Sequence, residues 1–444
     1  MDKLNLALQL ILSLSILVVL HEMGHYLPAK FFKTKVEKFY LFFDPYFSLF
    51  KKKIGDTEWG IGWIPFGGYV KIAGMIDESM DKDQMKQPPQ EWEFRSKKPW
   101  QRLIIMVGGV TVNFILGIII FAGMMMYWGE SYIKPADAQY GIAVDSLGMD
   151  LGLLDGDQIL SVGGVPLTKL SPDQVTKEIV INQAKEIVII RDSKEQTLPV
   201  DPSMVGKLTK YENRGKMLFV PRIPLGINDV TKGGNAEAAG LTKDMKILAV
   251  NGQPVPYQHQ LPTALRPLKS TTGKFEIIDA TGDTIQKDIA ITENGTIGIQ
   301  LAPMNKFVAT SSETYSFIPA VGKGWNMATG FLGNQLKAFG QIFTGKIKAK
   351  DSLGSVLSIA TMFDSGWDWR IFWNITASLS ILLAFFNLLP IPALDGGYVM
   401  FLLYEMITGK VPSDKFMEVV NYIGFILLMG LMVFALGLDI SRWF

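Results

Sequence analysis

The feature that most constrains this 444-residue chain is a set of four apolar stretches, each long enough to cross a lipid bilayer as a helix. They are Leu4 to Leu27, Leu103 to Trp128, Ile371 to Leu394 and Val419 to Leu438. The last three contain no Asp, Glu, Lys or Arg. Charged residues nevertheless make up 19% of the whole sequence, so a sizeable water-soluble part must accompany the spans. These observations predict a polytopic α-helical membrane protein with four transmembrane helices.

The first span contains a short polar motif, His21-Glu22-Met23-Gly24-His25. Positions i and i+4 share one face of a helix, so the imidazoles of His21 and His25 can converge on one metal ion. Glu22 is then placed to take a proton from a water at the metal, as in zinc peptidases. Ionisable residues inside a bilayer are costly and by default functional. The alternative is that the span ends at Leu20 and the motif is a solvated helix end.

The overall composition excludes several other classes of protein. The net charge is +1, and no basic stretch is interleaved with aromatic residues, so we expect no nucleic-acid partner. The chain has no cysteine, which rules out thiolate ligands and a disulfide framework. The first apolar run lacks a basic leader and a small-residue cleavage site, and it holds the candidate ligands. We therefore expect it to be retained and not removed as a signal peptide.

Basic residues in the first connecting segment predict the orientation of the chain. Pro28 to Gln101 is rich in lysine and arginine, whereas Lys3 is the one basic residue that precedes the first span. By the positive-inside rule, this segment is cytoplasmic and both termini lie outside. The long segment from Gly129 to Arg370 is then extracytoplasmic, and the metal motif lies near the cytoplasmic side.

The first connecting segment is richer in β-forming residues than an ordinary linker. Trp59 to Ile64 and Gly67-Gly68-Tyr69-Val70-Lys71 combine aromatic and β-branched residues with glycines, and Gly55-Asp56 precedes them as a turn signal. We predict a short β-hairpin and an apolar loop that dips toward the membrane beside the metal. An amphipathic hairpin on the protein surface would give the same pattern.

Two extracytoplasmic segments resemble each other in sequence. Residues 146–164 and 235–252 both run from a small helix through a glycine-containing turn to a strand that ends in Val-x-Gly or Val-Asn-Gly. This pattern resembles the core signature of PDZ domains, which bind an extended peptide along a sheet edge. We therefore expect two α+β PDZ-like domains. Spacers or steric gates with little affinity for peptides remain an alternative.

The region between the second repeat and the third span is amphipathic. Between Tyr315 and Lys350, apolar and aromatic side chains alternate with lysines and glutamines. This pattern favours helices that lie at the outer membrane surface. A groove for a partner helix, or packing on the repeats, would look the same.

A catalytic zinc ion usually has three protein ligands, so a third must accompany His21 and His25. His259 falls in the second repeat, on the other side of the membrane in this topology. The third ligand should then be a carboxylate, and Asp395 at the cytoplasmic end of the third span is the best placed, with Glu418 as the alternative.

The residues before Asp395 form a poor helix. Pro390 and Pro392 remove backbone donors, and two glycines follow the acid. Irregular backbone at membrane depth is tolerated where it faces protein or a water-filled cavity, so we expect the third span to unwind beside the metal. A simple kink would account for the prolines but not for Asp395 or Asn387.

Together these motifs resemble the site-2 protease family of intramembrane zinc metalloproteases, and within it the bacterial regulator-of-sigma-E type. The resemblance rests on His21-Glu22-x-x-His25, on Asn387-x-x-Pro390-x-Pro392-x-Leu394-Asp395-Gly396 and on the paired PDZ-like modules. Gly67-Gly68-Tyr69 matches the family's membrane-dipping β-loop, and Gly109-x-x-x-Asn113 matches its second-span motif. Val110 and Ser355 stand where family members often have proline, which affects loop geometry and not the chemistry.

The resemblance implies a zinc metalloprotease that cuts peptide bonds within the transmembrane segments of single-span membrane proteins. His21, His25 and Asp395 would bind Zn²⁺, and Glu22 would be the catalytic base. The implied substrate-binding residues are Asn387, Pro390, Pro392, Gly67, Gly68, Tyr69, Gly109 and Asn113. Asn387 would hold the substrate backbone or stabilise the oxyanion. Implied substrates are an anti-sigma factor and signal-peptide remnants, and the implied location is the bacterial inner membrane, with periplasmic termini and PDZ domains.

Two rival functions remain at this level. A membrane scaffold without enzymatic activity would use its PDZ-like modules to capture peptides, but it would not need Glu22 beside a metal ligand. A metal transporter would place polar residues along a path, whereas here they gather at one depth. The expected organisation is a metal-binding first helix (1–28), a β-loop region (29–101), a second helix (102–128), two PDZ-like domains (129–220 and 221–304), amphipathic helices (305–370), a third helix (371–397), a cytoplasmic loop (398–418) and a fourth helix with its tail (419–444).

Overall fold

The computed structural model describes residues 2–75, 87–213, 216–243, 245–348, 350 and 354–443. Part of the predicted β-loop region, 76–86, lies outside the described residues. The chain divides into two compact units. One contains residues 1–129, 314–340 and 353–444 and is mainly helical; the other contains residues 130–313 and 341–352 and is rich in strands.

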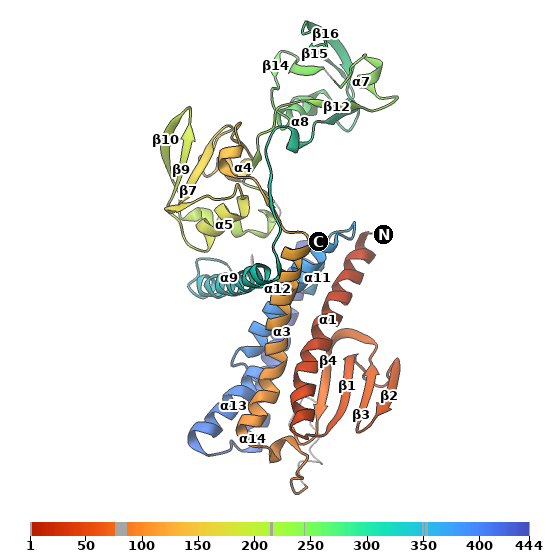
Figure 1. Ribbon diagram of the computed structural model, residues 1–444, viewed down its shortest axis with the longest axis vertical. Coiled ribbons are helices and arrows are strands. Elements are labelled where there is room, and N and C mark those ends of the chain that lie inside the picture. Colours follow the sequence, from red (N-terminus) through yellow and green to blue (C-terminus); the bar gives the residue numbers. More distant parts are fainter. Residues whose placement is uncertain are drawn as a thin grey trace. The chain divides into compact units, whose positions relative to one another are not determined.

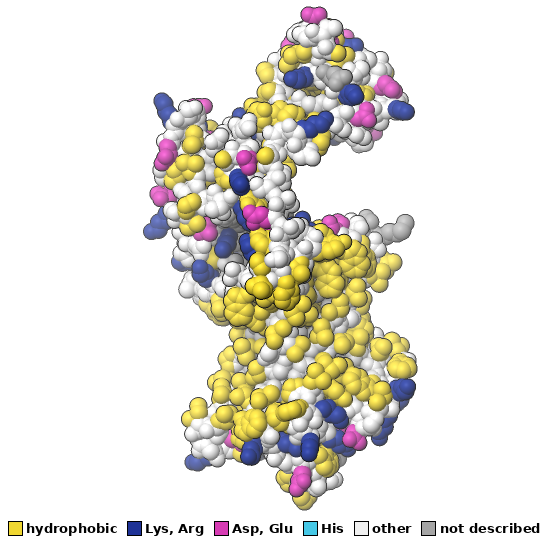
Figure 2. Space-filling view, viewed as in Figure 1, with side chains coloured by type: hydrophobic (Ala, Val, Ile, Leu, Met, Phe, Trp, Pro, Cys, Tyr) yellow, Lys and Arg dark blue, Asp and Glu magenta, His cyan; other side chains and the backbone are white. Residues whose placement is uncertain are grey.

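Among the described residues, four helices are long and apolar enough to cross a membrane. They are α1 (Asp2–Phe31), α3 (Pro99–Tyr127), α12 (Trp369–Leu388) and α14 (Asp414–Trp443). Their outward faces carry exposed apolar side chains, which form the hydrophobic belt of this unit in Figure 2. The structure thus contains four helices with the length and composition expected of membrane spans.

Helices α1, α3 and α12 pack closely against one another (Figure 1). At the α1–α3 contact, Gly24 and Gly108 meet backbone to backbone. A Cβ built on Gly24 would lie 2.5 Å from the Gly108 carbonyl oxygen. Ser380 Oγ on α12 donates a hydrogen bond of 2.7 Å to the backbone oxygen of Asn113 on α3. Such small-residue and hydroxyl contacts hold helices together in lipid, where burial of apolar surface supplies little driving force.

The first connecting segment folds into a four-stranded sheet and not into a short hairpin. Its strands are β1 (Val36–Phe43), β2 (Phe50–Ile54), β3 (Thr57–Ile61) and β4 (Ile64–Ile72), in the order β2-β3-β1-β4. Strands β2 and β3 do form a hairpin, but β3 also pairs in parallel with β1. The segment around Trp59 is therefore not a sheet edge. The two edge strands are β2 and β4. Strand β4 pairs with β1 on one side and packs against α1.

Helix α12 ends at Leu388, before Pro390 and Pro392, and the chain is non-helical until Asp395 begins helix α13 (Asp395–Thr408). The expected break in the third span is thus observed. The segment expected to be a loop, 398–418, is helical as far as Thr408. The two glycines after Asp395 lie in the first turn of α13, which packs against the end of α12. A Cβ on Gly396 would lie 2.1 Å from the Leu389 carbonyl oxygen.

The short helix α11 (Val356–Ala360) is tied to α14 by one buried carboxylate. Asp439 accepts hydrogen bonds from the backbone N–H and the hydroxyl of both Ser355 and Ser358, at 2.6 to 3.1 Å. These donors include the free N–H groups at the start of α11, which a helix cannot satisfy internally. Ser355, which departs from the family's usual proline, therefore contributes both a cap and a donor.

The mainly helical unit also contains most of helix α9 (Phe317–Phe343), as far as Gly340. This helix begins in the region expected to be amphipathic. Ala320 and Ala328 are buried against residues of α3, whereas Phe317, Ile318 and Trp325 are exposed. One face of the helix is therefore packed against α3, and the exposed face also carries apolar side chains. Its position at a membrane surface stays a prediction.

The strand-rich unit contains two modules with the same order of elements, except that helix α6 of the first has no counterpart in the second. The first comprises β6 (Ile142–Val144), α4 (Ser146–Met149), β7 (Gln158–Val162), β8 (Val165–Pro166), α5 (Pro172–Val180), β9 (Glu186–Arg191), β10 (Lys194–Pro199), α6 (Ser203–Thr209) and β11 (Phe219–Pro221). The second comprises β12 (Ile227–Val230), α7 (Asn235–Ala238), β13 (Lys246–Val250), β14 (Gln253–Pro254), α8 (Gln260–Leu265), β15 (Thr272–Ile278), β16 (Thr284–Ala290) and β17 (Ile299–Leu301). Strands β5 (Glu130–Tyr132) and β18 (Ser311–Glu313) pair where the chain enters and leaves the unit.

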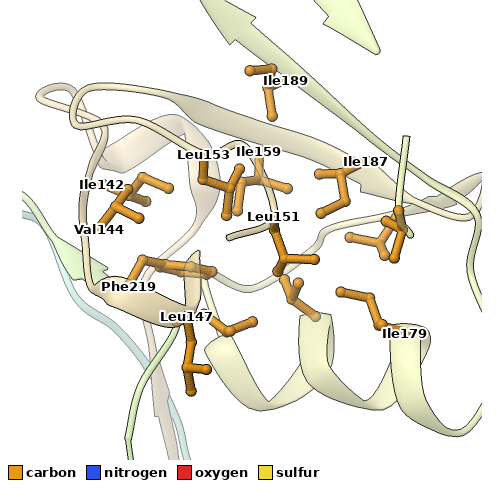
Figure 3. Close-up of a cluster of buried hydrophobic side chains, with 14 of the residues drawn as sticks. Ile142, Val144, Leu147, Leu151, Leu153, Ile159, Ile179, Ile187, Ile189 and Phe219 are labelled. Atoms are coloured by element: carbon orange, nitrogen blue, oxygen red, sulfur yellow. The ribbon is translucent and has the colours of Figure 1, made fainter. Parts of the chain in front are cut away.

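The sequence repeat corresponds to a structural repeat. The sheets run β8-β7-β9-β10 and β14-β13-β15-β16. Helix α5 follows β8 in the first module, and helix α8 follows β14 in the second. Figure 3 shows the core of the first module, where Ile142, Ile159 and Ile187 point into one cluster. Phe275 and Ile277 occupy the corresponding core of the second module. Each module therefore has its own hydrophobic core.

Candidate metal centre

Three side chains from two helices converge in the membrane unit. His21 and His25 are one turn apart on α1, and Asp395 is the first residue of α13. The His21 Nε2 and His25 Nε2 atoms are 3.2 Å apart, and Asp395 Oδ2 lies 3.3 Å from the first and 3.4 Å from the second. The structure thus brings together the three residues that the sequence singled out as ligands. Glu418, the alternative third ligand, lies on α14 and is not part of this cluster.

The spacing of these three atoms fits a tetrahedral metal ion. Bonds of about 2.0–2.1 Å at tetrahedral angles place neighbouring ligand atoms about 3.3–3.4 Å apart, close to the three distances observed. Within the described residues, no donor with hydrogen-bond geometry reaches the buried Asp395 Oδ2 atom. A buried carboxylate oxygen without a donor is costly unless a cation occupies the space before it. The donor set therefore fits a zinc ion.

The second nitrogen of each imidazole is also held. His25 Nδ1 lies 2.8 Å from the Ile105 carbonyl oxygen, which can only accept, so Nδ1 carries the proton. In the neutral ring, Nε2 is then left with a lone pair that faces the cluster. His21 Nδ1 lies 3.1 Å from the Asn113 amide. The other amide atom, Asn113 Oδ1, has no hydrogen-bond partner among the described residues, and rotation of the amide would present it to a proton on Nδ1.

Gly109 on α3 supplies the space that the imidazoles occupy. A Cβ at this position would lie 2.4 Å from His25 Nε2 and 2.7 Å from His21 Cε1. Any side chain here would displace the rings. Gly109 and Asn113, which the resemblance placed among substrate-binding residues, thus lie against the two histidines and not at a distance from them.

Glu22 lines a cavity next to the cluster. The cavity measures about 440 Å³, and its walls include His21, His25 and Asp395 together with Tyr69 and Val70 of β4. Val70 of the edge strand β4 lies beside the Glu22 carboxylate in this cavity. The open edge of the sheet therefore faces the carboxylate, and a peptide in the cavity would reach both.

Asn387 and the two prolines differ in how close they lie to the cluster. The Asn387 amide nitrogen lies 3.2 Å from His21 Nε2, the same atom that faces His25 and Asp395. Pro390 and Pro392 form part of the non-helical segment that leads to Asp395, and neither lines the cavity. A Cβ on Gly424 of α14 would lie 2.1 Å from the Pro392 carbonyl oxygen, so α14 packs directly on this segment.

The three expected residues of the β-loop lie on β4. Gly68 and Tyr69 line the cavity, and a Cβ on Gly68 would lie 2.6 Å from Val18 Cγ1 on α1. Gly67 has a φ of 71°, a left-handed conformation that favours glycine. The Tyr69 hydroxyl donates a hydrogen bond of 2.9 Å to Asp44, and burial raises the pKa of Tyr69 well above its usual range. Tyr69 is therefore a neutral wall of the cavity.

Sequence reasoning missed the backbone groups that complete the centre. The Ile105 carbonyl and the Val70 N–H contact His25 and Glu22, but backbone groups leave no signature in the sequence. His259 lies in the strand-rich unit, where its Nε2 atom is 2.7 Å from Asp155 Oδ2. It takes no part in the cluster.

Comparison with known proteins shows the family. The sequence model of peptidase family M50 matches residues 9–431. The chain belongs to this family. It is 28% identical to a protein of Neisseria meningitidis named "Putative zinc metalloprotease", with 98% of each chain covered. It is 27% identical to the regulator of sigma E protease of Haemophilus influenzae, with 97% of this chain and 98% of the relative covered.

Membership in peptidase family M50 confirms two predictions made from the sequence. The chain is a zinc metalloprotease, and it belongs to the site-2 protease family. The apolar helices and the family together indicate a membrane protein that acts as a protease.

Proposed function

We propose that this M50 peptidase is an intramembrane zinc metalloprotease that cuts single-span membrane proteins within their transmembrane segments. The observation that carries the proposal is the convergence of His21 Nε2, His25 Nε2 and Asp395 Oδ2 at 3.2 to 3.4 Å inside the membrane-spanning unit. His21, His25 and Asp395 would hold the zinc ion. Bound there, zinc supplies Lewis acidity to the scissile carbonyl and to the attacking water.

Glu22 is the general base in this proposal. It follows the first ligand directly in the chain and lines the same cavity. It takes a proton from the attacking water and returns it to the leaving amine. The backbone of Val70 beside it would orient the Glu22 carboxylate, so that the base is aligned before the substrate arrives.

Asn387 acts at the reacting carbonyl. Its amide nitrogen lies 3.2 Å from the nitrogen of His21 that faces the other two ligands. An amide donor at this place can stabilise the negative charge that develops on the carbonyl oxygen. The short distance to the ligand atoms favours this oxyanion role over binding of the substrate backbone elsewhere.

The substrate must become extended before it can be cut, because a helix encloses its own peptide bonds. Each unpaired backbone group in lipid costs several kcal/mol. We assign the replacement partners to the free edge of β4, which faces the cavity, and not to the Trp59–Ile64 segment. A substrate strand added there would restore backbone hydrogen bonds. Substrates with small or helix-breaking residues should then be favoured.

The two repeated modules act as PDZ-like size filters that exclude substrates with bulky extracytoplasmic domains. Their shared strand order and independent cores support a tandem of similar domains. Anti-sigma factors and signal-peptide remnants are the proposed substrates. The proposed location is the bacterial inner membrane, with the termini and modules in the periplasm. Deletion of residues 132–303 should allow untrimmed substrates to be cut; unchanged exclusion in a cleavage assay would contradict the filter.

The decisive experiment is cleavage of a model single-span substrate by the purified full-length protein. We expect Glu22→Gln to lower the cleavage rate by about a hundredfold or more, since proton transfer by a positioned group contributes that much. Zinc content should remain at the wild-type level, because the ligands are untouched. Chelation should abolish cleavage, and zinc should restore it.

A substrate whose span is stabilised by leucine replacements serves as the matched comparison in the same assay. It should be cut more slowly than the parent substrate. Full activity of Glu22→Gln would instead favour a scaffold without enzymatic chemistry, and equal rates for the two substrates would argue against strand addition.

A further inference from the structure

A second polar cavity lies at the end of α1, apart from the metal centre. It measures about 500 Å³ and is lined by Lys30, Lys33, Thr34, Lys35, Asp56 and Trp92. The lining contains three lysines and one carboxylate, and the Lys35 ammonium also lies 3.8 Å from the Glu37 carboxylate, so the charge around the cavity remains positive. A concave site with an excess of one charge concentrates ligands of the opposite charge. The expected ligand is an anion.

The walls of this cavity are fixed by the backbone. Lys33 has a φ of 56°, in the left-handed region, and this conformation ends α1. The Thr34 N–H donates to the Ala29 carbonyl at 2.8 Å, and the Lys35 N–H donates to the Trp92 carbonyl at 2.9 Å. The Lys35 ammonium also lies 4.8 Å from the centre of the Trp92 ring. The backbone of this turn and the Lys35 ammonium are therefore held at a defined place.

The hydroxyl of Thr34 points to a missing partner. Thr34 is only 2% exposed, and its Oγ1 atom has no hydrogen-bond partner among the described residues. Buried hydroxyl groups in folded proteins are nearly always hydrogen-bonded. Because this atom is shielded, an anion in the cavity would supply the acceptor once the Thr34 side chain turns its hydroxyl toward it. General attraction of lysines to the end of a helix, or to the cytoplasmic side of a membrane, does not explain this unsatisfied donor.

The cavity lies where a membrane-spanning helix ends. The span in α1 runs from Lys3 to Phe31, and Phe31 is 78% exposed. In Figure 2, basic side chains gather at one end of the apolar belt of this unit. The last turns of α1 also line an apolar cavity of about 490 Å³ between α1 and α3, with Leu27, Pro28 and Ile104 among its walls. Residues at the end of α1 thus line both cavities, Lys30 the polar one and Leu27 and Pro28 the apolar one.

We propose that these two cavities bind an anionic phospholipid. The phosphate is held by Lys30, Lys33 and Lys35 and accepts a hydrogen bond from Thr34 Oγ1. An acyl chain occupies the apolar cavity between α1 and α3. A free phosphate ion would use the first cavity alone, so the lipid accounts for both. Because α1 carries His21 and His25, the lipid is bound to the helix that holds two of the three candidate ligands.

Binding of lipids to the full-length protein in detergent, measured by native mass spectrometry, tests this proposal. The probes are phosphatidylglycerol, phosphatidylcholine and inorganic phosphate. The triple variant Lys30→Gln, Lys33→Gln, Lys35→Gln should bind phosphatidylglycerol roughly a hundredfold more weakly, at about fivefold for each lysine. The matched control is Lys51→Gln, Lys52→Gln, Lys53→Gln on the exposed strand β2, which loses the same charge outside the cavity. It should bind nearly as wild type does.

The variant Thr34→Val separates the built site from charge alone, because it keeps the shape and every lysine. We expect it to weaken binding of phosphatidylglycerol about tenfold, the effect of one hydrogen bond to a charged group. Equal losses in the two triple variants, or wild-type binding by Thr34→Val, would overturn the proposal. It would also be overturned if phosphatidylcholine bound as tightly, or if inorganic phosphate displaced the lipid at equal concentration. Thermal unfolding of each variant verifies that it is folded.

Discussion

Two carboxylates in the helical unit, Asp395 and Asp439, are both largely shielded from solvent but are satisfied in opposite ways. Asp439 is 1% exposed and accepts four hydrogen bonds from Ser355 and Ser358. Asp395 has a 16% exposed side chain, and its Oδ2 atom faces two imidazole nitrogens without a donor in hydrogen-bond geometry among the described residues. The hydrogen-bonding capacity of the Asp439 carboxylate is thus met by the protein itself. The Asp395 Oδ2 atom, in contrast, lacks a partner that the described residues do not supply.

This difference separates structural acids from functional acids in one membrane protein. A carboxylate that receives several hydrogen bonds can hold two segments together, and its removal leaves donors without acceptors. A carboxylate with an open oxygen beside two imidazoles is arranged for a cation. Substitution of the two acids should therefore affect different properties: activity for Asp395, stability for Asp439.

The largest effect is expected for Asp395→Asn. The variant keeps the shape of the side chain but loses the charge that a zinc ligand provides, so cleavage should fall by more than about a hundredfold. Bound zinc, measured by elemental analysis, should fall as well. The thermal unfolding midpoint of the metal-free protein should stay close to that of the wild type. An active, zinc-loaded Asp395→Asn variant would remove the basis of the comparison.

A smaller effect of the opposite kind is expected for Asp439→Ala. Loss of the acceptor leaves the donors of Ser355 and Ser358 unpaired and should destabilise the protein by roughly 3 kcal/mol. Zinc content and the cleavage rate per folded molecule should not change. Denaturation in mixed micelles measures the stability, and Ser358→Ala is the control that removes a single hydroxyl donor and keeps the backbone N–H. If Asp439→Ala abolished activity while leaving stability intact, the distinction between the two acids would fail.

The smallest of the three effects is expected for Asn113→Leu. Asn113 contacts Nδ1 of His21, and loss of such a partner of a metal ligand weakens metal affinity by about 10–100-fold. Competition with a chelator of known affinity measures this change. The variant Asn113→Asp, which retains an acceptor for the Nδ1 proton, should recover most of the affinity. If both variants bound zinc as the wild type does, Asn113 would have no part in orienting His21.

The sequence was most informative where chemistry and helical periodicity coincide. The spacing of His21 and His25 places both rings on one face of a helix, and the four spans follow from length and lack of charge. Asp395 was identified because prolines and glycines surround an acid at the end of a span. These signals are local, so one sequence is enough to find them.

The parts that the sequence did not predict depend on contacts between distant residues. No local pattern indicates that β3 pairs with β1 in parallel, and so a short hairpin was predicted where the chain forms a four-stranded sheet. Gly396 and Gly397 suggested a loop, yet they lie in the first turn of α13, where the backbone at Leu389 and Ile391 leaves no room for a Cβ. The acceptor role of Asp439 likewise became visible when Ser355 and Ser358 were brought to it by the fold.

The backbone contact between Gly24 and Gly108 restricts how a substrate can enter. Because the two helices touch there without intervening side chains, they can tilt about this point but cannot slide past or separate without losing the contact. His21 and His25 on α1, and Gly109 on α3, are within one turn of the pivot. A peptide is therefore not expected to pass between α1 and α3 at this point.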